Sequence, residues 1–240
     1  MTAFSSLPVR EVVGEPGDDQ GWPFTMGPVA QLLDDGLQLD ELTVLVGENG
    51  VGKSTIIEAV AMAYGLSAEG GSKNLRESAR PTESPLHERI RLVRGIGRSR
   101  WGYFLRAETM HGLLTYLEQH PSQYRPETHY HERSHGQAFN ELLDTKLADM
   151  AGRGGFLVLD EPEAGLSLLS QIALANKLAS LRDDRIQVLL ATHSPVLAAT
   201  PGAKIVELDE TGFHSRTWDQ LVTVSLYRRF LGDPGYFGLE

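Results

Sequence analysis

The stretch Gly47-Glu48-Asn49-Gly50-Val51-Gly52-Lys53-Ser54-Thr55 fits the pattern G-x-x-x-x-G-K-[ST]. The apolar run from Leu42 to Val46 precedes it and predicts a buried parallel strand, whereas Ser54 to Ala63 follows it and predicts a helix. Glycines at positions 47, 50 and 52 let the backbone curl, so that successive N–H groups and the helix N-terminus face one anion. The whole stretch is therefore predicted to bind the phosphates of a nucleotide.

Two side chains of this loop have the chemistry that a nucleotide needs. Lys53 is expected to reach the β- and γ-phosphates. Ser54 has the hydroxyl that nucleotide-bound Mg²⁺ requires, because Mg²⁺ takes hard oxygen ligands in a strict octahedron.

A second apolar strand, predicted from Gly155 to Asp160, runs directly into Glu161. Ligands bind at the carboxyl ends of strands in open α/β sheets, so both carboxylates are predicted site residues. We expect Asp160 to join the Mg²⁺ shell and Glu161 to accept a proton from the water that attacks the γ-phosphate. A further predicted strand, Arg185 to Thr192, ends at His193, which can sense a γ-phosphate at the same edge.

Composition limits the classes of function. The 240 residues allow one large α/β domain, which we predict for 1–240. No apolar run approaches the roughly 20 residues that span a bilayer, and the N-terminus lacks the apolar core of a signal peptide, so a cytoplasmic protein is predicted. The absence of cysteine excludes disulfides and thiolate metal sites, and the net charge of −10 opposes a wholly basic surface that coats nucleic acid.

The remaining chain has weaker local signals. Extended segments from Leu7 to Val13 and from Phe24 to Leu33 predict an antiparallel β portion over residues 1–41. A terminal hairpin is predicted from Lys204 to Leu208 and Phe213 to Thr217. Apolar periodicity predicts helices over Glu108 to His120, Gly136 to Met150, Ser167 to Ser180 and Asp219 to Leu231.

One run of the chain is basic. Between His87 and Arg106 only Glu88 opposes six arginines: Arg89, Arg91, Arg94, Arg98, Arg100 and Arg106. Alternation from Trp101 to Arg106 also predicts a strand that ends near Glu108. The arginines form either a solvated face or a contact with the phosphates of a nucleotide or nucleic acid, and only their location can decide.

Three histidines, His129, His131 and His135, are spaced closely enough to suggest a metal site. Neither a carboxylate nor a cysteine pattern completes it. The same segment includes Ser134-His135-Gly136-Gln137, in which Ser134 is a plausible N-cap for the following helix.

The ordered set of GENGVGKST, SHGQ, LVLDEPEAGLS and ATHSP resembles the ABC-type ATPases over nearly the whole chain. The LRAE strand end and DEPEA are similar to small stand-alone bacterial ATPases of the AAA/ABC class, closer to the SMC, RecF and OLD-type branch than to transporter subunits. The resemblance implies a P-loop α/β fold with a mostly parallel central sheet flanked by helices. The N-terminal antiparallel portion and a reduced helical portion over 109–150 would complete it.

The resemblance also implies a mechanism. SHGQ looks like the signature sequence of the family, which would place Ser134, Gly136 and Gln137 against ATP bound by a second copy in a head-to-tail homodimer. A helix N-terminus with a serine and a glycine suits such an anion. Glu108 stands where the family has a lid glutamine, so the resemblance implies that Glu108 contacts Mg²⁺ or water. Ser167 stands where an aspartate is usual.

The family chemistry, Mg²⁺-dependent ATP hydrolysis, allows several uses. The DEPEA resemblance and the basic run favour nucleic-acid maintenance or defence, with DNA or RNA as partner. A nucleotide-dependent switch that binds a protein partner is the alternative. A transporter subunit is disfavoured, because the 25 residues between Glu108 and Ser134 are too few for the usual helical subdomain; they are also too few for a coiled-coil arm.

Overall fold

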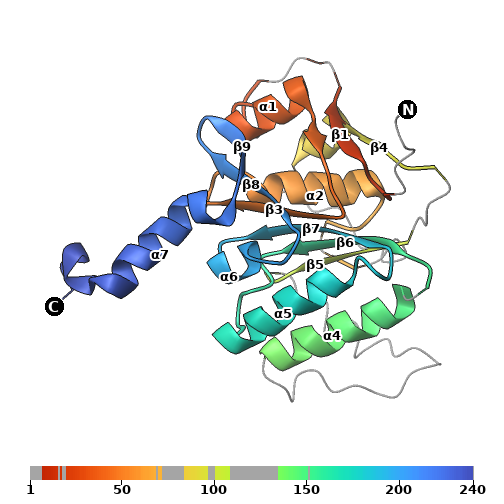
Figure 1. The fold of residues 1–240 in the computed structure, drawn as a ribbon. Helices are drawn as coiled ribbons and strands as arrows, with labels where there is room; N and C mark the ends of the chain where they lie inside the picture. The colour runs from red at the N-terminus through yellow and green to blue at the C-terminus, as the bar shows by residue number, and fades with distance from the viewer. Residues whose placement is uncertain are drawn as a thin grey trace, which may run out of the picture.

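A mostly parallel sheet forms the centre of the protein, as seen in a computed structural model (Figure 1). The structure describes residues 7–15, 17, 20–68, 70–71, 84–96, 101–108, 135–150 and 152–239. Within these residues the larger sheet contains, in spatial order, β5 (Gly102–Arg106), β6 (Gly155–Asp160), β7 (Ile186–Thr192), β3 (Leu42–Gly47), β8 (Lys204–Asp209) and β9 (Gly212–Arg216). All neighbouring strands pair in parallel except β8 and β9, which form the predicted terminal hairpin.

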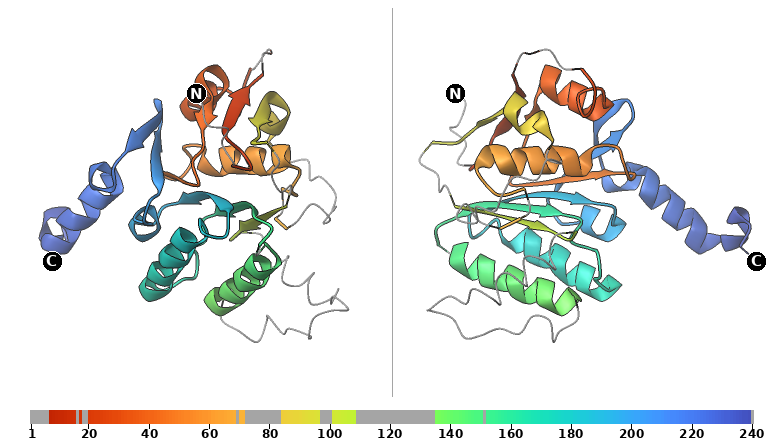
Figure 2. Two further views of the ribbon diagram at one scale, coloured as in Figure 1. Left: turned by 45° about the vertical axis from the view of Figure 1, so that its right-hand side comes forward. Right: turned by 180° about the vertical axis from the view of Figure 1, so that it is seen from behind.

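Helices cover both faces of this sheet. On one face lies α2 (Lys53–Tyr64), with α1 (Gly27–Asp35) and a small second sheet beyond it (Figure 1). On the other face lie α4 (His135–Met150), α5 (Leu168–Ser180) and the short α6 (Pro195–Ala198) (Figure 2). The α/β class and the layered, mostly parallel sheet predicted from the sequence are therefore confirmed.

Alternating side chains of the central strands fill two separate cores. In β3, Leu45 joins the core beneath α2, whereas Val44 and Val46 join the core beneath α4 and α5. In β6, Val158 and Leu159 divide in the same way. A strand buried on both faces has no polar alternation, which explains why these strands are continuous apolar runs in the sequence.

The segment from Phe24 to Leu33, predicted as extended, is largely helical and contains most of α1. Its buried residues Pro28, Val29 and Leu32 follow the spacing of a helix face rather than the alternation of a strand. Proline in the first turn suits a helix start, and Gly36 follows the last turn with a positive φ of 71°. Pro28 in the first turn is a local sign of a helix start that the prediction did not use.

An antiparallel portion is present, as predicted for residues 1–41, but one of its strands comes from a later segment of the chain. Its central strand β1 (Glu11–Gly14) pairs with β2 (Leu37–Gln38) on one side and with β4 (Ile90–Val93) on the other. The third strand therefore comes from the basic run, after the 3₁₀ turn η1 (Pro85–Arg89). The pairing of β4 with β1 could not be predicted from local sequence, because the two strands are far apart in the chain.

The C-terminal helix α7 (Val222–Gly232) extends away from the sheet, with a 3₁₀ turn on each side, η3 (Trp218–Gln220) and η4 (Pro234–Phe237) (Figure 2). Apolar side chains of α5, α6 and α7 line a cavity of about 610 Å³. Leu169 on α5 and Leu231 on α7 are among the most exposed apolar side chains described. In the part of the chain that the structure describes, no helix has both the length and the apolar character to cross a membrane.

Candidate nucleotide site

The predicted phosphate loop occupies the turn between β3 and α2. Lys53 is buried, and its Nζ donates hydrogen bonds to the carbonyl oxygens of Gly47 (2.9 Å) and Glu48 (2.8 Å). Gly52, which precedes the helix, has a φ of 105°, a conformation that glycine adopts at little cost. A Cβ at Gly47 would lie 2.4 Å from the carbonyl oxygen of Leu208, so the strand packing also requires glycine there.

Electrostatics of the loop depend on the acids that face it. Burial lowers the pKa of Lys53 from its ordinary value, while the negative charges of Glu161, Asp160 and Glu163 oppose that shift. These three acids come from the end of β6 and the turn after it. The structure thus places Lys53 and the predicted acids near one another, although nearly 110 residues separate them in sequence.

Ser54 and Asp160, the two predicted Mg²⁺ ligands, are in contact. Ser54 Oγ donates a hydrogen bond of 3.1 Å to Asp160 Oδ1, which joins the first turn of α2 to the end of β6. Burial raises the pKa of Asp160 to about 6, against the lowering effects of Arg106, Ser54 and Lys53. The hydroxyl and the carboxylate are two oxygen ligands of the kind that Mg²⁺ takes. A bound cation would also offset much of the cost of burying the charged carboxylate.

Glu161 and His193 also meet. Glu161 Oε1 lies 2.9 Å from His193 Nε2, across the ends of the neighbouring strands β6 and β7. Glu161 has a positive φ of 51°, which is uncommon for a residue other than glycine. Such backbone strain is typical of functional sites, where the surrounding structure holds a side chain in one direction.

Glu163 entered the sequence analysis only as part of the DEPEA motif, yet it organises the loop around His193. Its Oε1 accepts hydrogen bonds from Thr192 Oγ1 (2.7 Å) and from the backbone N–H groups of His193 (2.6 Å) and Ser194 (3.2 Å). One carboxylate oxygen therefore fixes three successive residues. No local pattern indicates this role, because the acceptor and its donors are about 30 residues apart.

Gln171 extends the same network to α5. Its Oε1 accepts a hydrogen bond of 2.6 Å from Ser194 Oγ, and its Nε2 donates one of 3.1 Å to the carbonyl of Leu166. Ser167 caps α5, with its hydroxyl accepting from the N–H of Ser170. The turn after Glu163 and the loop of His193 are thus joined through one glutamine that sequence analysis did not single out.

Family comparisons agree with this geometry. Residues 137–199 match the family described as "AAA domain, putative AbiEii toxin, Type IV TA system", and residues 37–95 match a family described as "AAA domain". The first match includes the acids after β6 together with His193, and the second includes the phosphate loop.

Two stretches of the chain are thus similar to AAA-type ATPase domains.

Relatives and solved structures extend this finding. An uncharacterized ABC transporter ATP-binding protein of Haemophilus influenzae is 26% identical over 207 residues, which cover 78% of each chain. LptB of Acidithiobacillus ferridurans, a lipopolysaccharide export system ATP-binding protein, is 27% identical over 169 residues, or 64% of this chain and 69% of LptB.

Two solved structures share the fold of this chain. The first is cbiO1 of Clostridium perfringens, part of the ABC transporter complex cbiONQ, with a TM-score of 0.54 at 16% identity over 95% of this chain and 97% of cbiO1. The second is an inward-facing metal-chelate type ABC transporter, with a TM-score of 0.52 at 17% identity over 92% of this chain and 88% of that one.

The signature segment is described only in part. Ser134, His129 and His131 lie outside the described residues, as do the helix predicted before them and the side chain of His135. Gln137 is exposed on α4, and a Cβ at Gly136 would lie 3.1 Å from the carbonyl oxygen of Gly165. The start of α4 therefore approaches the turn after Glu163 closely. Among the described residues, no group of three or more His, Cys, Asp or Glu side chains could hold a metal ion.

The described arginines of the basic run contact protein groups. Arg89 donates to the carbonyl of Glu15 (2.6 Å), Arg91 pairs with the Glu15 carboxylate (3.3 Å), and Arg94 lies over the ring of Tyr64. Arg98 and Arg100 lie outside the described residues. The described part of the run is therefore distributed over several sites, and its last member, Arg106, lies in the nucleotide site itself.

Arg106 is the site residue that sequence analysis misplaced. Its Nη1 lies 2.6 Å from Glu58 Oε2, its Nε lies 3.4 Å from Asp160 Oδ2, and its Nη2 lies 3.3 Å from Glu108 Oε2. Glu108, predicted to contact Mg²⁺ or water, lies in the turn after β5 with 79% of its side chain exposed. The strand register, which pairs Arg106 with Asp160, is the signal that could have indicated this contact.

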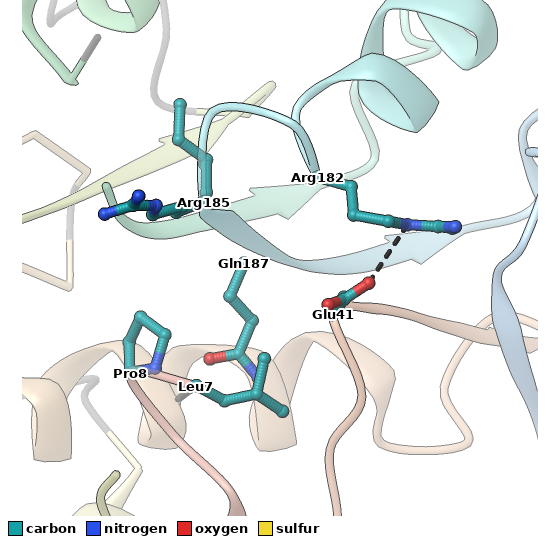
Figure 3. A pocket seen from close by; sticks show the side chains of 7 residues that line it. Leu7, Pro8, Glu41, Arg182, Arg185 and Gln187 are labelled. Carbon is teal, nitrogen blue, oxygen red and sulfur yellow. Dashed lines mark ion pairs between the residues drawn. The ribbon is translucent and has the colours of Figure 1, made fainter. Parts of the chain in front are cut away.

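A smaller pocket lies at the opposite end of the sheet (Figure 3). The amide of Gln187, near the start of β7, accepts from the N–H of Val9 (2.8 Å) and donates to the carbonyls of Val9 (2.6 Å) and Asp40 (2.9 Å). Arg182 and Glu41 form an ion pair of 3.0 Å at the rim. This pocket is distinct from the nucleotide site, because His193 follows the other end of the same strand.

Proposed function

We propose that this ATPase domain binds ATP with Mg²⁺ at the phosphate loop and hydrolyses it. The observation that carries the proposal is that Ser54 meets Asp160 and Glu161 meets His193 at one edge of the sheet. A hydroxyl and a carboxylate 3.1 Å apart fit the oxygen preference of Mg²⁺. The bound metal would neutralise charge on the transferred phosphoryl group, which needs positioning and charge neutralisation more than covalent chemistry.

Lys53 has a direct part in this proposal. Its ammonium group is bonded to the carbonyls of Gly47 and Glu48, groups that belong to the loop itself. Exchanging these bonds for phosphate oxygens replaces neutral acceptors with charged ones, and charge-assisted hydrogen bonds are the stronger kind. The lysine therefore supports the shape of the loop through these two bonds and would bind the β- and γ-phosphates of a nucleotide.

Glu161 is the proposed general base. Its carboxylate lies 2.9 Å from His193 and is directed by an unusual backbone conformation, so that it can accept a proton from an attacking water. His193 would contact the γ-phosphate, in a loop that Glu163 holds through three hydrogen bonds. The proposed roles of the two catalytic side chains thus depend on the hydrogen bonds that one further acid makes to this loop.

We also propose that two copies enclose two ATP molecules in a head-to-tail dimer. The support is the resemblance of the segment from Ser134 to Gln137 to the family signature, together with the helix that begins at His135. A helix N-terminus offers unpaired N–H groups and a partial positive charge to an anion. Gly136 and Gln137 of one copy would contact the γ-phosphate that is bound by Lys53 of the other.

Glu161→Gln tests the catalytic proposal. The amide is nearly isosteric but a poor proton acceptor, so ATP binding is retained while turnover falls by roughly 10²- to 10⁴-fold. Light scattering of this variant with Mg·ATP should show a dimer that the nucleotide-free protein lacks. Turnover close to wild type would remove Glu161 from its assigned role, and a monomer under saturating Mg·ATP would refute the sandwich.

For the cellular role, we propose nucleic-acid maintenance or defence in the cytoplasm. The family description that names a toxin of a type IV toxin–antitoxin system supports defence. The described arginines of the basic run support nucleic-acid binding less than the sequence alone suggested, because each contacts a protein group. DNA or RNA contact would then fall to residues other than these arginines.

A protein-binding switch is the second candidate, and the apolar surface of α5 and α7 favours it. Leu168, Leu169, Leu226 and Leu231 are all at least 48% exposed, beside an apolar cavity. Clustered exposed apolar side chains are typical of protein interaction sites. The names of the curated relatives would instead suggest a transporter, which requires a membrane subunit.

A pull-down with tagged Glu161→Gln and Mg·ATP, with and without nuclease, separates these roles. Nucleic acid, or partners lost after nuclease treatment, supports maintenance or defence on DNA or RNA. A nuclease-resistant soluble partner whose capture is lost when Leu169 and Leu231 are changed to Ser supports the switch. Capture of an integral membrane protein contradicts both and favours transport.

A further inference from the structure

Arg106 lies among three carboxylates that come from three parts of the chain. Glu58 belongs to α2, Asp160 ends β6, and Glu108 follows β5 in a turn. The distances to the guanidinium are 2.6, 3.4 and 3.3 Å in that order. Only 19% of the Arg106 side chain and 3% of the Asp160 side chain are exposed. One cation therefore contacts three acids, of which Glu58 and Asp160 are largely shielded from water and Glu108 is exposed.

Two of these carboxylates are the ones assigned to metal. Asp160 uses its second oxygen, Oδ1, to accept the hydrogen bond of Ser54, so both of its oxygens have partners without metal. Glu58 differs from the other two acids, because it lies on the same helix as Ser54, one turn further on. Its bond to Arg106 is also the shortest of the three.

We infer that Arg106 is the built-in counter-cation of the metal site, which holds Asp160 and Glu108 in the absence of Mg²⁺ and releases them to the metal while it stays bonded to Glu58. The inference rests on the proposed Mg²⁺-dependent nucleotide binding. Like charges repel, so a guanidinium and Mg²⁺ compete for the same carboxylates. Arg106 acts as a positioning residue in this account, because its contacts are to acids and not to reacting atoms.

A consequence is that free Mg²⁺ without nucleotide binds wild type weakly. Phosphate oxygens are needed to complete the metal shell and to displace Arg106 from Asp160. Removing the positive charge should leave an acid group that attracts Mg²⁺ by itself. An adjacent charge changes ionic equilibria by roughly 10- to 10³-fold, so Arg106→Gln should bind free Mg²⁺ about 10-fold more tightly, or better.

The test measures Mg²⁺ affinity by calorimetry and the melting temperature in MgCl₂, against NaCl of equal ionic strength, on nucleotide-free full-length protein. In NaCl, Arg106→Gln should melt below wild type, and MgCl₂ should restore much of the loss. Arg106→Lys keeps one charge but cannot pair with three acids, so its Mg²⁺ affinity should lie between those of the other two proteins. If the Gln variant does not fold, the Lys variant decides, and Mg²⁺ affinity equal to wild type overturns the inference.

Arg94→Gln is the matched control, because Arg94 donates to the carbonyl of Tyr64 (3.2 Å) and lies over its ring, with no acid among these contacts. It should lose stability without any gain from Mg²⁺ beyond that of wild type. Adding Asp160→Asn to Arg106→Gln should abolish the Mg²⁺ response. An equal Mg²⁺ response in the Arg94 variant, or one that survives Asp160→Asn, overturns the inference.

Binding of Mg·ATP to wild type separates this inference from the proposed function. A wild type that does not bind Mg·ATP refutes the proposed function. A wild type that binds Mg·ATP, combined with an Arg106→Gln variant whose free Mg²⁺ affinity is unchanged, refutes the role of Arg106 alone.

Discussion

The two ends of the parallel sheet satisfy their polar groups in different ways. At the amino end, the buried amide of Gln187 makes three hydrogen bonds to backbone groups of other segments. At the carboxyl end, Asp160 is held by another side chain that is itself charged, and burial raises its pKa. Glu161 adds an uncommon backbone conformation. The first arrangement is complete in itself, whereas the second carries a burial cost that a bound cation would lower, which supports the proposed nucleotide site at the carboxyl end.

Asp160→Asn should give the largest effect on stability. The pKa of Asp160 rises from 3.8 to about 6, so the folded protein holds this proton more tightly than the unfolded chain. This tighter proton binding stabilises the folded protein below pH 3.8, the ordinary pKa of the group, and the stabilisation is lost as the pH rises through about 6. At pH 7.5 the nucleotide-free Asn variant should therefore be more stable by up to about 3 kcal/mol.

Urea unfolding at pH 4.5 and pH 7.5 measures this prediction, and the gain should be much smaller at the lower pH. The control is Asp209→Asn, because hydrogen bonds from Thr211 lower the pKa of this half-exposed acid and its contribution has the opposite sign. A gain of equal size for both variants would show that loss of any negative charge stabilises the protein, and the contrast between the two ends would fail.

Glu163→Ala should lower turnover by about 10²-fold while ATP affinity stays close to wild type. The variant removes the acceptor for Thr192, His193 and Ser194, and misplacing a catalytic group by about 1 Å can cost that much. Steady-state turnover and equilibrium binding, measured on the same preparation, test it. Weaker ATP binding with unchanged maximal turnover would show that Glu163 supports the nucleotide pocket instead.

At the amino end, Gln187→Ala should reduce stability and leave catalysis unaffected. Three backbone groups lose a partner, and an unsatisfied buried polar group costs about 1–3 kcal/mol. Denaturant unfolding gives the loss, and turnover per folded molecule should equal wild type. The matched variant Arg182→Gln breaks the exposed pair with Glu41, which is worth less than about 1 kcal/mol. A large loss of turnover in either variant would mean that the two ends are coupled.

The sequence predicted the elements whose signals are local. The phosphate loop between strand and helix, the acids after β6 and the histidine after β7 each lie in a continuous stretch, and the structure brings Ser54 to Asp160 and Glu161 to His193. The roles assigned to these residues stay predictions until nucleotide is bound.

Contacts between distant segments could not be predicted in this way. Arg106 was grouped with a basic run because five arginines precede it between His87 and Arg100, whereas its neighbour across the sheet is Asp160. Glu163 was visible only as part of the DEPEA motif, and its role depends on donors about 30 residues away. The Phe24 to Leu33 error had another cause. Pro28 is compatible with the end of a strand or the start of a helix, and the helix forms because it buries Val29 and Leu32 on one face.

Binding of Mg·ATP to wild type and to Lys53→Ala, measured by calorimetry on nucleotide-free protein, tests the central claim most directly. Lys53 is the buried cation at the phosphate loop, so wild type should bind Mg·ATP at one site per chain and the variant should show no measurable binding. Equal affinity in the two proteins would contradict the assignment of this loop as the nucleotide site.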